Sequence, residues 1–241
     1  MIAFIGISIS SFAQRDEIFQ PNHDDYPYYL GINLGTSNYF FSIHRASNFN
    51  ANSTHKFFPL NTQFINLGLS GTLKLNNRFL LRSAPTLMIN GNKSFMVSND
   101  IDPNKNDIYS TDAVFFDIPI DLKFQSDRYN AFKFPEIMRH YVFGGFKYSF
   151  DMSSKNPSIN GIEKVHPLLI KGSDLAYEFG FGLSFFLRYA IISPEVKFSY
   201  GLTNLVKPTS NTPPLPIISL NSVDKLTSNF IYFTLHVEGT L

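Results

Sequence analysis

The sequence contains no cysteine and no tryptophan among its 241 residues. Without cysteine the chain has no disulfide, no thiolate metal ligand and no cysteine nucleophile. Its 20 basic and 19 acidic residues leave a formal net charge of +1. Because nucleic-acid binding needs an excess of positive charge against the phosphate backbone, we do not expect a nucleic-acid partner.

The sequence also lacks a long apolar run, since none approaches the roughly 20 residues that a transmembrane helix needs. The first 13 residues are apolar and end in Ser11 and Ala13, the small residues that precede a signal-peptidase site, although the usual basic start is missing. We predict a signal peptide at residues 1–13 and a periplasmic N-terminal segment at residues 14–27. A buried N-terminal strand is the alternative.

Aromatic residues, by contrast, are abundant: 26 Phe and 12 Tyr favour β-strands. From residue 28 onward, apolar and polar residues alternate with the period of a strand, as where Ile118, Ile120 and Leu122 oppose Asp121 and Lys123. The alternation predicts an all-β fold, an eight-stranded antiparallel up-and-down transmembrane β-barrel over residues 28–241. The predicted strands cover about 29–35, 65–75, 78–90, 114–124, 142–150, 175–185, 192–202 and 231–238.

The predicted connections alternate in length. Those at 45–60, 91–110, 152–171 and 203–226 are long and polar, those at 76–77 and 188–190 are short, and the one at 126–136 is intermediate. Outer-membrane barrels have long external loops, short periplasmic turns and, with an even strand number, periplasmic termini. We therefore predict a bacterial outer-membrane location with both termini in the periplasm.

A soluble barrel such as a lipocalin is the alternative, because it shows the same alternation with its faces reversed. Two sets of residues favour the membrane. Small residues on the polar face suit a narrow lumen, namely Gly31, Gly35, Gly68, Gly180, Gly182 and Gly201. Tyrosines near strand ends or on outer faces suit an interfacial girdle, namely Tyr28, Tyr29, Tyr39, Tyr148, Tyr189, Tyr200 and Tyr232.

The interior of an eight-stranded barrel is just wide enough for its own side chains, so we expect a filled lumen. Charges of both signs fall on the predicted inner faces and can pair with one another, which favours a polar core over a proton or ion path. These charges are Arg82, Asp117, Asp121, Lys123, Lys147, Glu178, Glu195, Lys197 and Glu238.

No catalytic, cofactor-binding or metal-binding residues are predicted. Ser42 and His44 form the one same-face pair that suits a lipid hydrolase, but no third member accompanies them. His236 and Glu238 also share a face, where lumen packing is the simpler interpretation. Residues 102–107 resemble a calcium loop whose sixth position lacks Gly and whose twelfth, Ala113, is not Glu.

Five segments carry a likeness to a known family: DIPIDLKF at 117–124, YVFGGFKY at 141–148, EFGFG at 178–182, SPEVKFSYGLTN at 193–204 and VDKLTS at 223–228. In these segments the sequence resembles the PorT (also SprT) family of the type IX secretion and gliding-motility system of Bacteroidota. The resemblance implies a non-enzymatic outer-membrane protein needed to export cargo with a C-terminal signal, surrounded by outer-membrane lipid and contacting other secretion components. It carries over no catalytic residue and implies no cofactor or small-molecule substrate.

Two other functions remain open. One is a structural or adhesive barrel of the small OmpA/OmpX-like type, and the other is a lipid-modifying enzyme that uses Ser42 and His44. In the secretion interpretation, the proline-rich stretch between Thr203 and Leu226 is a candidate recognition segment, because prolines lower the entropic cost of ordering a loop.

Overall fold

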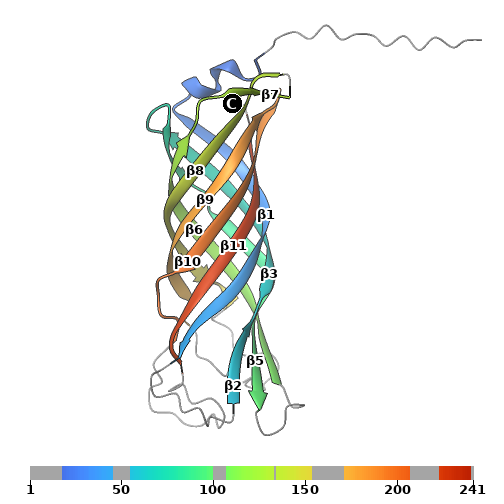
Figure 1. Cartoon of the computed structure of the whole chain (residues 1–241), viewed down its shortest axis with the longest axis vertical. Helices are drawn as coiled ribbons and strands as arrows, with labels where there is room; N and C mark the ends of the chain where they lie inside the picture. The colour runs from blue at the N-terminus through green and yellow to red at the C-terminus, as the bar shows by residue number, and fades with distance from the viewer. Residues whose placement is uncertain are drawn as a thin grey trace, which may run out of the picture.

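The computed structural model describes residues 18–45, 55–99, 107–132, 134–153, 171–206 and 223–239. Within these ranges, one antiparallel sheet winds into a tall barrel (Figure 1). The elements are a short 3₁₀ helix, η1 (Pro21–Asp25), and the strands β1 (Tyr28–Arg45), β2 (His55–Leu60), β3 (Thr62–Lys74), β4 (Phe79–Ser83), β5 (Thr86–Asn99), β6 (Asp107–Gln125), β7 (Tyr129–Ala131), β8 (Phe134–Asp151), β9 (Ser173–Phe186), β10 (Ala190–Gly201) and β11 (Val223–Gly239).

The barrel wall is a ring of eight strands, as predicted. A single residue separates β2 from β3 and two residues separate β4 from β5, so each pair runs as one interrupted strand. The ring closes where β1 pairs with β11 from Gly31↔Glu238 to Arg45↔Val223, and β1 pairs on its other side with β3. The three-residue β7 lies outside the ring of eight and pairs with the start of β8.

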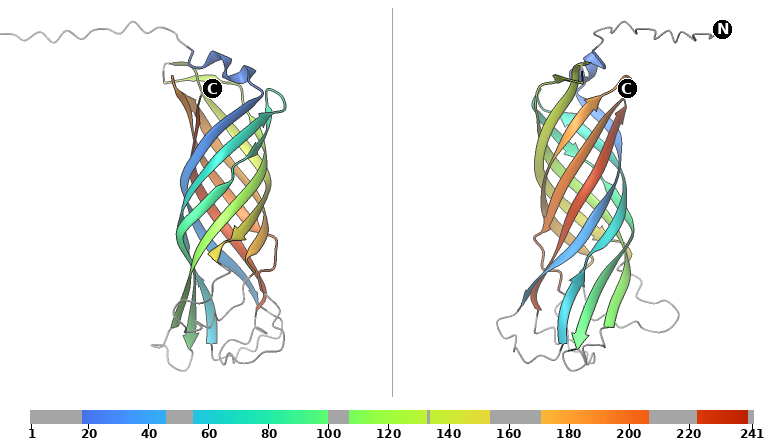
Figure 2. Two further views of the ribbon diagram at one scale, coloured as in Figure 1. Left: turned by 180° about the vertical axis from the view of Figure 1, so that it is seen from behind. Right: turned by 45° about the vertical axis from the view of Figure 1, so that its right-hand side comes forward.

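The two ends of the barrel differ. At the end that we call the turn end, the strands are joined through residues 75–78, 126–133 and 187–189, and η1 and the end of β11 lie there too. At the opposite end, the loop end, β1, β5, β8 and β10 finish (Figures 1 and 2). The predicted short connections at 76–77 and 188–190 are therefore confirmed, and both lie at the turn end.

The predicted connections at 45–60, 91–110, 126–136 and 203–226 are too long, because strands of the structure extend into each of them. Residues 55–60 form β2, and β5 continues through Asn99 in register with β2 and β6. The pairing passes a bulge between Met88 and Gly91, where Asn90 has a φ of 61°. Backbone hydrogen bonds sustain the strands here although the hydrophobic alternation has faded, which is why the sequence pattern ended early.

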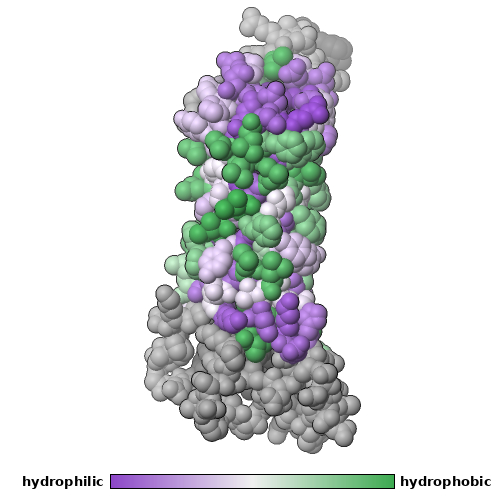
Figure 3. All heavy atoms as spheres, turned by 90° about the vertical axis from the view of Figure 1, so that its left-hand side faces the viewer, coloured by the Kyte–Doolittle hydropathy of each residue, from purple (hydrophilic) through white to green (hydrophobic). Residues whose placement is uncertain are grey.

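The outer face of the wall is apolar and the inner face is polar. Leu69, Phe146 and Ile120 point outward and are 66%, 61% and 59% exposed, whereas Asn66 and Asp121 are buried inside. In the view of Figure 3, green apolar side chains gather along the middle of the barrel between two hydrophilic bands. This is the arrangement of a membrane barrel and the reverse of a soluble one, which settles the alternative left open by the sequence. The described residues include no helix with the length and apolarity to cross a membrane.

The predicted tyrosine girdle is only partly correct. Tyr28, Tyr148, Tyr189 and Tyr200 are exposed on the outer surface. The prediction is wrong for three others, which are buried in the lumen because they follow the inward alternation of their strands: Tyr29, Tyr39 and Tyr232.

Candidate functional site: the filled and capped barrel interior

A buried cluster of charges occupies the middle of the lumen. The Arg82 guanidinium, from β4, donates to both carboxylate oxygens of Glu195 on β10, with Nη1–Oε2 and Nη2–Oε1 distances of 2.6 and 3.2 Å. It also lies 3.4 Å from Asp121 on β6. The Tyr141 hydroxyl donates to Glu195 at 2.9 Å, and His236 Nε2 lies 3.5 Å from the same carboxylate. Five different strands therefore meet in one network across the lumen.

A second network lies beside it. Asp117 accepts hydrogen bonds from Lys147 at 3.1 Å, from the Tyr232 hydroxyl at 2.7 Å and from Ser149 at 2.6 Å. Lys147 also donates to the Tyr232 oxygen at 2.5 Å, so that hydroxyl accepts from one partner and donates to the other. These bonds compensate charges that would be costly to bury alone.

All nine charges predicted to face the lumen are buried. Lys197 pairs with Glu178 at 3.1 Å, and the Lys123 ammonium lies 3.7 Å from the centre of the Tyr141 ring. Glu238 lies at the turn end within electrostatic range of Lys123. The arrangement can fix the distances between opposite walls of the barrel, which is the work of a polar core.

On the loop-end side of the charges, aromatic side chains fill the lumen. Tyr39, Phe115 and Phe230 form its centre, with ring centroids 4.6 to 5.7 Å apart. The sequence interpretation missed this cluster, although its members occupy inward positions of the same alternation. The buried cluster comprises Tyr39, Phe41, Phe64, Met88, Ala113, Phe115, Leu205, Leu226, Phe230 and Tyr232.

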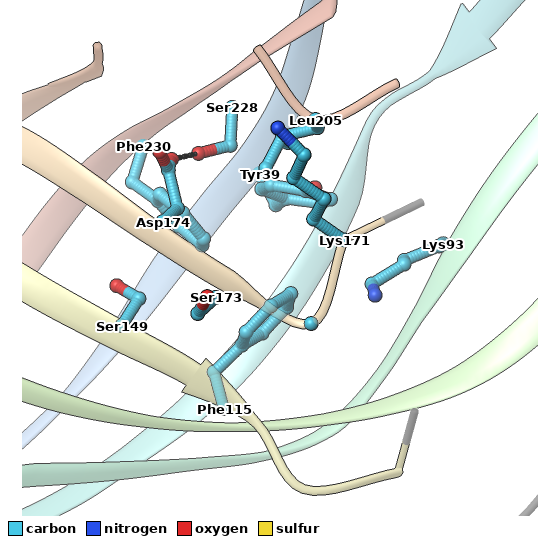
Figure 4. Close-up of a pocket in the computed structure, with 11 residues that line it drawn as sticks. Tyr39, Lys93, Phe115, Ser149, Lys171, Ser173, Asp174, Leu205, Ser228 and Phe230 are labelled. Atoms are coloured by element: carbon cyan, nitrogen blue, oxygen red, sulfur yellow. Dashed lines mark hydrogen bonds between the residues drawn. The ribbon is translucent and has the colours of Figure 1, made fainter. Parts of the chain in front are cut away.

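A small cavity lies against this aromatic cluster at the loop end. Lys93, Phe115, Asp174 and Ser228 are among the side chains that line it (Figure 4). Asp174 accepts a hydrogen bond from the Ser228 hydroxyl, while Lys93 pairs with Asp151. The cavity measures about 10 Å³, which is room for about one water molecule.

Glycines make room for the interior rings. Tyr141 lies opposite Gly182 and Phe143 lies opposite Gly180 in the register of β8 and β9. A Cβ atom at Gly182 would lie 2.4 Å from the Tyr141 ring, and one at Gly180 would lie 2.5 Å from the Phe143 ring. The prediction that small residues on the polar face serve a narrow lumen is therefore confirmed at these positions.

The turn end carries a cap formed by Phe19–Asp25, which contains η1 (Figure 1, blue coil at the top). Arg139, on β8, binds both carboxylate oxygens of Asp24 at 3.0 and 2.8 Å, and Arg128 Nε donates to Asp24 Oδ2 at 2.9 Å. Arg128 comes from the connection between β6 and β8, which the sequence predicted to be of intermediate length. This connection serves to hold the cap.

The neighbouring His23 is buried inside the barrel mouth. Its ring stacks on Tyr29 with centroids 4.2 Å apart and meets Phe186 edge-on at 5.8 Å. Burial lowers the pKa of His23 to about 4, against the opposing effect of Glu238 and Asp24. For Asp24, burial works to raise the pKa, but the hydrogen bonds and charge of Arg139, with Arg128, lower it below its usual value. The docked cap thus holds a neutral imidazole beside an ionised carboxylate.

The remaining sequence candidates do not assemble into a site. Ser42 accepts a hydrogen bond from Asn229 at 2.8 Å, and no hydrogen bond between Ser42 and the exposed His44 exists in the described part of the chain. His236 belongs to the Glu195 network instead of pairing with Glu238. Across the described ranges, no three His, Cys, Asp or Glu side chains gather in a way that could hold a metal. The calcium-like stretch at 102–106 and residues 207–222 of the proline-rich stretch lie outside the described residues.

An apolar belt around a closed ring of eight strands, with charges and rings packed inside, defines a bacterial outer-membrane β-barrel. The chain belongs to the family described as "Outer membrane protein beta-barrel domain", whose profile matches residues 12–207. A comparison with curated proteins gives no match.

Several solved structures are similar in fold. OprG from Pseudomonas aeruginosa has 12% sequence identity and a TM-score of 0.48, with 88% of this chain and 96% of that chain covered. Neisserial surface protein A has 11% identity and a TM-score of 0.41, with coverages of 88% and 97%. Ail, the attachment invasion locus protein of Yersinia pestis, has 11% identity and a TM-score of 0.36, with coverages of 88% and 99%. The likeness to PorT remains a prediction from the sequence.

Proposed function

We propose that this barrel is a non-enzymatic component of the type IX secretion system, needed for export of C-terminal-signal cargo across the outer membrane. In this proposal residues 1–13 are a signal peptide, residues 14–27 are periplasmic, and the turn end faces the periplasm with both termini. The protein acts through contact with other secretion proteins and binds no small-molecule substrate.

One observation carries the idea of action by contact: the lumen is packed along its length. The Arg82 and Asp117 networks fill its middle, the Phe115 cluster fills its loop end, and the cap lies over its turn end. A polypeptide cannot pass through a space filled in this way. In this proposal the protein therefore contacts its partners through the two ends of the barrel. The segments 193–204 and 223–228, which carry the PorT resemblance, supply the secretion part of the proposal.

The test compares the secreted proteins of a strain that lacks the gene with those of its parent and of a complemented strain. We expect C-terminal-signal cargo to disappear from the medium and to accumulate in the periplasm. Complementation with the Ser42→Ala and His44→Ala variants should restore export in full, because neither residue has a catalytic role in this proposal. Unchanged secretion would contradict the secretion role and favour a structural or adhesive barrel. Failure of the alanine variants alone would favour the lipid-modifying alternative.

A further inference from the structure

We propose that the turn end of the barrel is a docking site for a peptide of another protein, in which an aromatic or imidazole side chain directly precedes an acidic residue. The chain's own His23–Asp24 pair occupies this site as a tethered pseudo-ligand. The inference deepens the proposed function, since it assigns the partner contact to one surface of the barrel.

The half of the site that receives the acidic residue consists of two buried arginines. Arg128 and Arg139 are only 5% and 8% exposed in their side chains, and both bind the single carboxylate of Asp24. Their guanidinium carbons lie 3.8 and 5.4 Å from the centre of the Phe186 ring, which packs against both. Paired guanidiniums held on an aromatic face form a preorganised carboxylate receptor.

This receptor has more hydrogen-bond donors than its present occupant uses. Both guanidiniums bind the one carboxylate of Asp24, yet within the described residues Arg128 Nη2 and Arg139 Nε have no hydrogen-bond partner. Asp25, the next acidic residue, is exposed and does not fill the gap. An acidic peptide with a further acceptor would therefore complement the site better than the cap does.

The aromatic half of the site is the slot between Tyr29 and Phe186, into which the His23 ring inserts. The slot and the arginine pair come from four separate parts of the barrel: β1, β8, β9 and the connection at 126–133. Adjacent residues of one peptide fill both halves, so recognition requires a planar side chain followed directly by a carboxylate.

In this proposal the cap can leave the site without disturbing the barrel wall. It contributes no strand pairing to the barrel, whose closure runs through β1 and β11 independently of it. Its attachments are side-chain contacts and bonds to carbonyls, such as those from Arg128 to Phe19 and Gln20 at 3.1 and 3.2 Å. Gln20, at its entry, has a φ of 53°, a left-handed conformation that is unfavourable for a residue other than glycine. Release of the cap would relieve this strain and leave the barrel intact.

The test uses the full-length chain in detergent micelles and, as the probe, a fluorescent peptide with the sequence of residues 18–26 (IFQPNHDDY). Three variants are compared with the natural protein: Asp24→Ala, which vacates the arginine pair, Asp25→Ala, the matched control one residue away, and Asp24→Ala combined with Arg139→Gln. A heat-modifiable gel shift verifies that each barrel is folded. Fluorescence anisotropy measures peptide binding.

We expect the Asp24→Ala variant to bind the peptide at least about tenfold more tightly than the natural protein or Asp25→Ala, because the competing carboxylate of the cap is gone. Adding Arg139→Gln, or using the peptide with its own Asp24→Asn replacement, should remove that gain. If the folded Asp24→Ala variant binds no better than Asp25→Ala, the inference is overturned. Binding in micelles together with unchanged secretion would refute only the secretion role, whereas lost secretion without peptide binding would refute only the docking site.

Discussion

Tyr141 and Gly182 are direct cross-strand partners on β8 and β9, and the Tyr141 ring lies over the glycine where a side chain would otherwise begin. The same ring donates its hydroxyl hydrogen to Glu195 across the lumen. The missing side chain of Gly182 therefore sets the position of a residue that ties two walls of the barrel together. Size, and not backbone freedom, is what this glycine provides.

A Gly182→Ala replacement should lower the free energy of unfolding by about 1–3 kcal/mol, the usual cost of overpacking a tight interior. Its Cβ would lie 2.4 Å from Tyr141. The matched control is Gly144→Ala, because a Cβ there would meet its nearest atom at 3.6 Å. Urea unfolding in lipid vesicles measures both variants, and equal stabilities would contradict the packing role.

Loss of Glu195 should be among the most damaging single changes in the lumen. Glu195→Ala leaves the buried Arg82 charge without its bidentate partner, for which we expect a loss of about 3–5 kcal/mol. Asp127→Ala is the control, because its pair with Arg78 is 59% and 77% exposed and should contribute about 1 kcal/mol or less. A Glu195→Ala barrel as stable as the control would show that the Arg82 network does not hold the walls together.

The apolar outer belt predicts that the loss of stability caused by a charged substitution depends on its depth in the membrane. Phe181 faces outward and pairs with Val142 and Val196 in the middle of the wall, so Phe181→Lys should cost about 2–4 kcal/mol in a bilayer. Leu75→Lys, in the turn at 75–78, should cost about 1 kcal/mol or less because it lies near the interface. Unfolding titrations in vesicles compare the two, and a reversed order would contradict the assigned position of the belt.

Docking of the cap should weaken in acid. The pKa of His23 is about 4 in the docked state against 6.5 ordinarily, so a released cap takes up a proton that the docked cap excludes. Docking is therefore at full strength above about pH 6.5 and weakens as the pH falls toward 4. Asp24 does not weaken it in this range, because its own pKa lies below the usual value and its ion pairs persist. The charged groups that face His23 are Asp24 on the cap, Glu238 on β11, Arg128 and Arg139.

Spin labelling can follow this release, because the chain has no cysteine and Asn22→Cys on the exposed side of the cap gives a unique site. We expect the label to become more mobile between about pH 7 and about pH 4. A His23→Phe replacement should keep the stacking on Tyr29 and abolish the pH dependence. A label that stays immobile throughout, or one that is released equally in His23→Phe, would contradict the role of the imidazole.

The hydrophobic alternation was sufficient to predict the strands and their inward charges, since the period of two is a property of each strand by itself. It placed Asp117 and Lys147 on inner faces of separate strands, but it could not pair them. Their contact depends on the register of β6 against β8, where Asp117 lies opposite Ser149 and Lys147 opposite Pro119. The sequence did not predict the Phe115 cluster for a related reason. Inward and outward aromatic residues differ only in their place in the alternation, and a polar lumen was expected.

By itself, the sequence determined the β class, the number of wall strands and which residues of each strand share a face, because each follows from local composition and periodicity. Which of the two faces points outward was settled by the structure. Only the tertiary structure decided how far β2 and β5 extend, which rings face Gly180 and Gly182, and that Asp24 lies between Arg128 and Arg139. These features join residues more than 100 positions apart or depend on backbone pairing that leaves no mark on side-chain polarity. The contact of the cap with the barrel is the clearest case. Asp24 and its partners Arg128 and Arg139 lie in unremarkable stretches of the sequence, and only closure of the barrel brings them to the same mouth.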